Sequence, residues 1–109
     1  MPMTTAEIFD AMVQNVNPSA ASGLNKTFQW NITGDDPGVY AIKLENGQAE
    51  LIKGGVEKPD LTLTVSDKDW ASIVEGKLDP TTAFMTGKIK ISGDMMLAMR
   101  LQNLFNRPR

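Results

Sequence analysis

The order of apolar and polar residues divides the chain into a helical start, an alternating middle and a helical end. Near the N-terminus, apolar residues recur at helical spacing behind a Thr4-x-x-Glu7 capping box, which predicts a helix over residues 4–17. Pro18 ends that helix and opens a short further turn over 17–22. The N-terminal part is therefore expected to carry one ordinary amphipathic helix.

The middle of the chain has a period of two. Apolar side chains alternate with polar ones in the segments 28–33, 40–45, 48–53 and 61–65. Asn46-Gly47, between the second and third of these segments, is the strongest short hairpin signal in the chain. Because each segment has one apolar and one polar face, the pattern predicts an antiparallel sheet with one side in water and the other covered.

The elements that cover this sheet follow in the sequence. Helix-start residues at Ser66 and Asp79, and the glycines that come after them, predict helices over 66–76 and 79–87. A fifth strand is expected over 88–92, with two isoleucines inward and two lysines outward. The pattern thus predicts a single domain over 1–109 of the α/β (α+β) class, in which four to five helices cover one face of a five-stranded sheet.

The last segment, GDMMLAMRLQNLF at 93–105, predicts a helix with two apolar faces. One face is the usual core stripe, formed by Leu97, Ala98, Leu101, Leu104 and Phe105. The other face consists of Met95, Met96 and Met99. Methionine suits surfaces that accept variable apolar shapes, so this face indicates a ligand, lipid or partner. A second core layer and a homodimer contact are the alternatives.

Composition excludes several classes of chemistry. The chain has no cysteine and no histidine, which rules out disulfides, thiolate metal sites and Ser-His or Cys-His catalysis. The acidic residues occupy turns, helix starts and the outer sheet face, where structural roles account for them. We therefore expect no catalytic residue, no bound metal and no cofactor.

Charge is distributed unevenly along the chain. Residues 1–85 carry six Lys and Arg against twelve Asp and Glu, whereas residues 86–109 carry five against one. The basic end coincides with the two-faced helix, a pairing that favours an anionic head group or transient contact with a membrane surface. The scattered cations are too few to indicate nucleic acid. The chain shows no long apolar run and no signal peptide, so we expect a soluble, intracellular and cytoplasmic protein.

Three motifs stand out after Pro59, namely EGKLDP at 75–80, AFMTGKIKISG at 83–93 and AMRLQNL at 98–104. In these motifs the chain closely resembles the sterol carrier protein type-2-like domains. It implies a five-stranded sheet with helices packed on one side and an apolar tunnel between the layers. It also implies an intracellular lipid-binding or lipid-transfer protein, which holds a fatty acid, fatty acyl-CoA, sterol or phospholipid without chemical change.

The resemblance makes the last helix one wall of the tunnel, with its methionine face toward the lipid. Four aromatic residues of the sheet and helices are expected to point into the same interior, although core packing alone explains each of them. The predicted ligand-binding residues are Met12, Trp30, Ile32, Tyr40, Ile42, Trp70, Val74, Phe84, Met85, Met95, Met96, Met99, Leu101 and Leu104. Head-group polarity is expected to matter little unless Arg100, Gln102 or Lys88 reaches the tunnel mouth.

The sequence departs from the family at its end. Peroxisomal members end in a Ser-Lys-Leu-type address, whereas this chain ends in NRPR at 106–109, so a peroxisomal location is not expected. A monomer is expected. The competing hypothesis is a non-carrier interaction module, whose methionine face mediates homodimerisation or docks on a lipid-metabolising enzyme.

Overall fold

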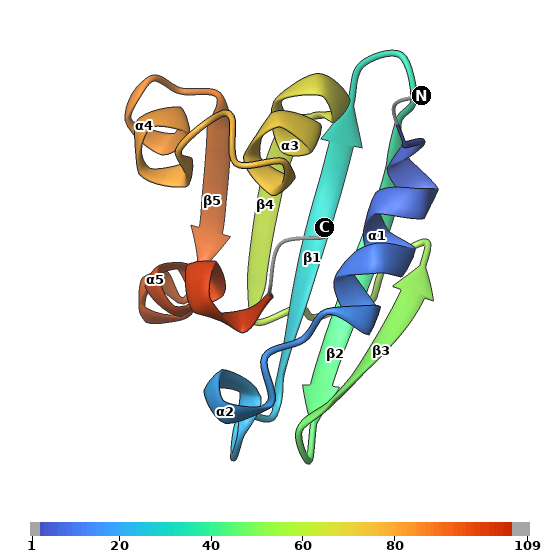
Figure 1. Ribbon diagram of the computed structural model, residues 1–109, viewed down its shortest axis with the longest axis vertical. Helices are drawn as coiled ribbons and strands as arrows, with labels where there is room; N and C mark the ends of the chain where they lie inside the picture. Colours follow the sequence, from blue (N-terminus) through green and yellow to red (C-terminus); the bar gives the residue numbers. More distant parts are fainter. Residues whose placement is uncertain (1–2, 106–109) are drawn as a thin grey trace.

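The computed structural model describes residues 3–105 as one five-stranded sheet with the helices on one of its faces (Figure 1). The strands lie side by side in the order β3-β2-β1-β4-β5. Their bounds are β1 Lys26–Thr33, β2 Gly38–Glu45, β3 Gln48–Lys53, β4 Leu61–Ser66 and β5 Ile89–Gly93. The helices are α1 Thr5–Gln14, α2 Pro18–Ala21, α3 Asp67–Val74, α4 Pro80–Met85 and α5 Met95–Leu104. The predicted α+β class and its five strands are confirmed.

The sheet is mixed, so the expectation of a purely antiparallel sheet was wrong. β1 and β4 run parallel, from the pair Phe28 and Leu61 to the pair Thr33 and Ser66, while the other neighbouring strands are antiparallel. The loop over 54–60 carries the chain from β3 across β2 and β1 to the far side of β1. Alternation reports which face is covered but not the direction of the neighbouring strand, so the pattern left this crossover undetected.

The core lies between the sheet and the helices and is dominated by aromatic rings. Phe9 of α1 stacks on Tyr40 of β2, with 4.4 Å between ring centroids, and meets the edge of Trp30 at 5.3 Å. Trp30 in turn lies 5.6 Å from Trp70 of α3. Aromatic pairs at these distances contribute about 0.5–1.5 kcal/mol each beyond their buried area. They fix α1 and α3 over the centre of the sheet.

A chain of hydrogen bonds positions the starts of α1 and α3. The Thr5 backbone N–H donates to Asp36 Oδ2, and the Asp36 N–H donates to Asp67 Oδ2, each over 2.8 Å. Asp36 lies in the turn between β1 and β2, and Asp67 is the first residue of α3. These bonds hold the pKa of the Asp67 carboxyl below its usual range, mainly because the Asp36 N–H stabilises the ionised form. Both helices are thereby fixed to one end of the sheet.

The last helix is anchored at both of its ends. At its start, the Asp94 N–H donates to the carbonyl of Asp60 over 3.1 Å. At its end, the Asn17 N–H donates to the carbonyl of Leu104 over 2.7 Å. Leu97 and Leu104 are buried, whereas Met95, Met96 and Met99 are exposed. α5 therefore packs on the core with one face and leaves the other face unburied.

Phe84 differs from its predicted place in the common interior. It is 44% exposed, while Trp30, Tyr40 and Trp70 are buried. The physical reason is the position of α4, a short helix that lies over the edge strand β5 (Figure 1). In that position only Ala83 of α4 reaches the core.

Candidate functional site

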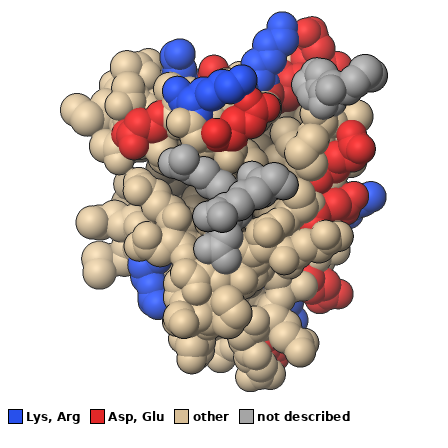
Figure 2. Space-filling model, viewed as in Figure 1, with Lys and Arg blue, Asp and Glu red and all other residues tan. Residues whose placement is uncertain are grey.

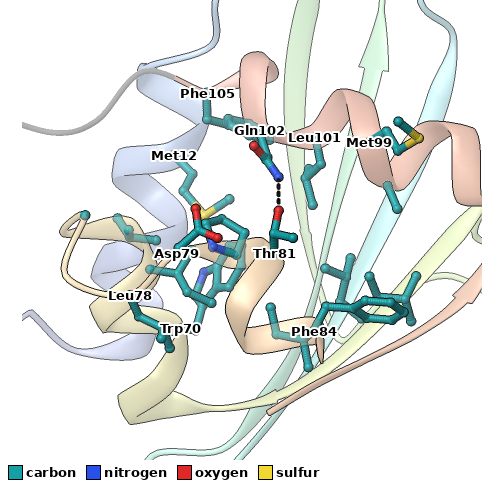
Figure 3. A pocket seen from close by; sticks show the side chains of 18 of the residues that line it. Met12, Trp70, Leu78, Asp79, Thr81, Phe84, Met99, Leu101, Gln102 and Phe105 are labelled. Atoms are coloured by element: carbon teal, nitrogen blue, oxygen red, sulfur yellow. Dashed lines mark hydrogen bonds between the residues drawn. The ribbon is translucent and has the colours of Figure 1, made fainter. Parts of the chain in front are cut away.

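A pocket of about 860 Å³ lies between α3, α4, α5 and the inner face of β4 and β5 (Figure 3). The sheet contributes Leu63, Ile89 and Ile91, and α1 contributes Met12. α3 and the loop after it contribute Trp70, Ile73, Val74, Gly76, Lys77, Leu78 and Asp79, and α4 contributes Pro80, Thr81 and Phe84. α5 contributes Met95, Ala98, Met99, Leu101 and Gln102, and Phe105 follows directly after it. Most of these side chains are apolar. The pocket is therefore suited to a hydrocarbon ligand rather than to a hydrophilic one.

Polar side chains gather where the loop after α3 approaches α5. Gln102 Nε2 donates a hydrogen bond to Thr81 Oγ1 over 3.3 Å, which joins α5 to α4 across the pocket. Asp79 caps α4 by accepting from the Thr82 N–H at 3.0 Å. Lys77 Nζ lies 3.0 Å from Glu75 Oε2. We call the side chains of Lys77, Asp79, Thr81 and Gln102 the polar rim.

The wall of the pocket also contains a buried donor. Trp70 is 6% exposed, and its Nε1–H has no hydrogen-bond partner among the described residues. Burial of an unpaired N–H costs about 1–3 kcal/mol. Figure 3 shows the Trp70 ring on the same side of the pocket as Met12 and Leu78. A lipid in the pocket would therefore lie beside an indole ring, which gives binding an optical reporter.

Half of the predicted ligand-binding residues line the pocket. They are Met12, Trp70, Val74, Phe84, Met95, Met99 and Leu101. Five others lie in the core outside the lining, namely Trp30, Ile32, Tyr40, Ile42 and Leu104. Met85 and Met96 lie outside the lining and are 79% and 72% exposed. The lining thus includes no residue of β1 or β2.

The prediction missed other residues that line the pocket. Ile89 and Ile91 already carried a signal, because the alternation of β5 marked them as inward. Asp79 and Thr81 carried none, since a helix cap and an exposed threonine have no pattern that indicates a ligand. Gln102 was named as a residue that would matter at the mouth, and it does line the pocket. Lys88 and Arg100, named with it, are not among the lining residues.

Burial shifts the pKa of one tyrosine in the core. Burial raises the pKa of the Tyr40 phenol, and the carboxylates of Asp36 and Asp10 raise it further, so this hydroxyl stays protonated. Over residues 3–105, no group of three or more acidic side chains is arranged to hold a metal ion. Within the same residues, no helix is long and apolar enough to cross a membrane.

Comparison with known proteins shows to which family the chain belongs. A sequence profile described as the SCP-2 sterol transfer family matches residues 7–106. The chain belongs to this family. The predicted resemblance to sterol carrier protein type-2-like domains is therefore confirmed, and the SCP-2 match extends over nearly the whole chain.

Individual SCP-2 relatives agree with this assignment. The chain is 40% identical to sterol carrier protein 2 of Bos taurus over 78 residues, which cover 68% of this chain and 14% of that protein. It is 32% identical to hydroxysteroid dehydrogenase-like protein 2 of Xenopus laevis over 102 residues, which cover 93% of this chain and 24% of that protein. The chain thus spans a quarter or less of these curated relatives.

A solved structure of similar size shows the same SCP-2 fold. The solution structure of palmitated SCP2L2 from Aedes aegypti superposes with a TM-score of 0.75 at 28% identity. The match covers 91% of this chain and 91% of that one. The fold described above is therefore found in a protein about as long as this one.

Proposed function

We propose that this chain binds one amphiphilic lipid in the pocket and transfers it without chemical change. The single observation that carries the proposal is the pocket, whose volume of about 860 Å³ falls within the range of small-molecule sites and whose lining is mainly apolar. Membership of the SCP-2 sterol transfer family supports it, as does the palmitated relative with the same fold. Sterols and fatty acids are the ligand classes that this support favours.

Burial of a hydrocarbon chain in the pocket supplies enough free energy for lipid binding. Burying a chain of about sixteen carbons gives roughly 13 kcal/mol at ~0.8 kcal/mol per methylene. Ordering the lipid and the side chains around it consumes much of this gain. We expect micromolar or tighter binding with weak discrimination among chain lengths, since one methylene at ~0.8 kcal/mol changes the affinity by only about fourfold.

The methionine face has a place in this proposal. Phe84, Met95 and Met99 are all exposed, and all three also line the pocket. The same side chains thus extend the apolar lining to the surface, where a lipid tail enters or leaves. We infer that this face contacts a membrane transiently while lipid is exchanged, and that the carrier is a monomer within the cell.

Acidic side chains are distributed unevenly over the face shown in Figure 2. They run along the right-hand edge and across the top, with one group at the upper left, while most of the lower left is uncharged apart from a basic side chain. A surface of this kind can approach the anionic head groups of a bilayer with little repulsion. Binding to phosphatidylserine vesicles, compared with vesicles of phosphatidylcholine alone, measures this contact.

Native mass spectrometry of freshly purified protein tests the function. A lipid that remains bound under mild conditions and is released under denaturing ones supports the carrier. A lipid-free dimer would instead support the interaction module, in which the methionine face mediates homodimerisation.

Quenching of tryptophan fluorescence tests where the lipid lies. A fatty acid brominated along its chain quenches a nearby indole, so it should quench the emission contributed by Trp70. The Trp70→Phe variant is the control, because it retains only the emission of Trp30, which lies behind Trp70 in the core. Equal fractional quenching of the two proteins would place the lipid elsewhere.

A further inference from the structure

We propose that the pocket selects uncharged amphiphiles, such as long-chain alcohols or sterols, over ionised fatty acids. The inference rests on the proposed function, since it concerns which lipid the same pocket holds. It is carried by the charges of the polar rim, which favour a hydrogen-bond donor and disfavour an anion.

Counted with Glu75, which pairs with Lys77, the charged side chains at the rim carry one more negative than positive charge. Lys77 is the one cation among the residues that line the pocket, and the Glu75 carboxylate at 3.0 Å already compensates its charge. Asp79 forms no ion pair with any described residue, and its carboxylate accepts only from the N–H and hydroxyl of Thr82. Thr81 and Gln102 are neutral and bonded to each other. A head group at the rim therefore meets one uncompensated carboxylate.

The arrangement of the lining orients a lipid with its head at this rim. Apolar side chains of the sheet, α3 and α5 form the rest of the pocket, and a hydrocarbon tail is stabilised against them. Figure 3 shows Asp79 on one side of Thr81, with Phe84 and Met99 on the other. A tail that extends from the rim toward Phe84 and Met99 lies on apolar side chains, and its polar end then remains near Asp79.

A hydroxyl head group and an ionised carboxylate head group interact differently with the Asp79 carboxylate. A hydroxyl can donate to the Asp79 carboxylate, and hydrogen bonds to ionised acceptors are roughly twice as strong as neutral ones. An ionised fatty acid has acceptors only, so it forms no such bond and is repelled by the like charge. Because Asp79 is exposed, water screens this repulsion, and the expected discrimination is severalfold rather than many orders of magnitude.

The test compares palmitate with hexadecanol, which share a sixteen-carbon chain, by equilibrium dialysis at pH 7.4 and low salt. In the Asp79→Asn variant, palmitate should bind about threefold to tenfold more tightly, because one like charge near the head group is removed. Hexadecanol should bind no more tightly than to the wild type, because the charged acceptor is lost. Asparagine caps helices as well as aspartate does, so α4 should still begin at the same residue.

Arg100→Gln is the matched control, since Arg100 is an exposed cation of α5 outside the lining. It should leave both affinities within about twofold. Weaker palmitate binding in this variant, with no change in the Asp79→Asn variant, would place the head group at the methionine face and overturn the inference. If the wild type binds both lipids and the Asp79→Asn variant has the same ratio of affinities for them, the inferred selectivity is overturned. The proposed function is not affected by that outcome. Wild-type protein that binds neither lipid overturns the proposed function as well.

Discussion

At the scale of single residues, position relative to the pocket separates side chains that look alike in the sequence and are similarly exposed. Met85 and Met99 are 79% and 74% exposed, yet only Met99 lines the pocket. Neither side chain contributes to the buried core. A charge at either position should therefore leave the fold intact, and only the position that lines the pocket should affect the lipid.

The Met99→Glu variant should lose lipid binding by about tenfold or more, because a carboxylate next to a hydrocarbon tail loses hydration. Its melting temperature should stay within a few degrees of the wild type. Met85→Glu is the control and should bind palmitate normally. Dialysis and thermal unfolding measure the two effects, and loss of fold together with binding in Met99→Glu would place Met99 in the core instead.

At the scale of elements, the polar link from α1 through the β1–β2 turn to α3 holds two helices in register with the sheet. Its central group is the Asp67 carboxylate, which accepts from the backbone N–H groups of Asp36 and Lys68, each over 2.8 Å. The link orients α3, which supplies Trp70 and Val74 to the pocket. Its strength should depend on pH, since only the ionised carboxylate accepts both bonds.

The pKa of Asp67 is lower in the folded chain than in the unfolded one, so its ionised form stabilises the fold. This contribution should be complete above the unfolded pKa of about 3.9 and lost as the pH falls through the folded pKa. The Asp67→Asn variant should therefore be less stable than the wild type at pH 7, and the difference should shrink below about pH 4. Urea unfolding at both pH values measures this, and a difference independent of pH would contradict the assignment.

At the scale of the whole molecule, the helices cover the sheet unevenly. α1 and α3 close over β1 and β2 with packed aromatic rings, while α4 and α5 leave the pocket open over β4 and β5. Several lining side chains are exposed, Met99 among them, so the apolar lining meets solvent when no lipid is bound. A lipid that covers this surface should stabilise the folded chain.

Palmitate at 100 times its dissociation constant should add about 2.7 kcal/mol to the free energy of unfolding. For a domain near 100 residues, this corresponds to a rise of roughly 10 °C in melting temperature. Calorimetry of delipidated protein with and without palmitate measures the shift. An unchanged melting temperature under these conditions would contradict binding to the folded state.

The sequence by itself determined the elements, because local spacing and capping act over a few residues. The caps at Thr4, Ser66, Asp79 and Asp94 accept hydrogen bonds from their helix starts. The two faces of α5 follow from the helical period, and the family follows from the motifs of the C-terminal half.

Only the tertiary structure decided which apolar side chains border the pocket. Ile42 of β2 and Ile89 of β5 are both buried, but only Ile89 lines the pocket. The parallel pairing of β1 with β4 and the meeting of Asp79 with Gln102 at one rim depend likewise on the packing of distant segments. Such contacts join residues far apart in the chain, and the local pattern of apolar and polar positions carries no information about them.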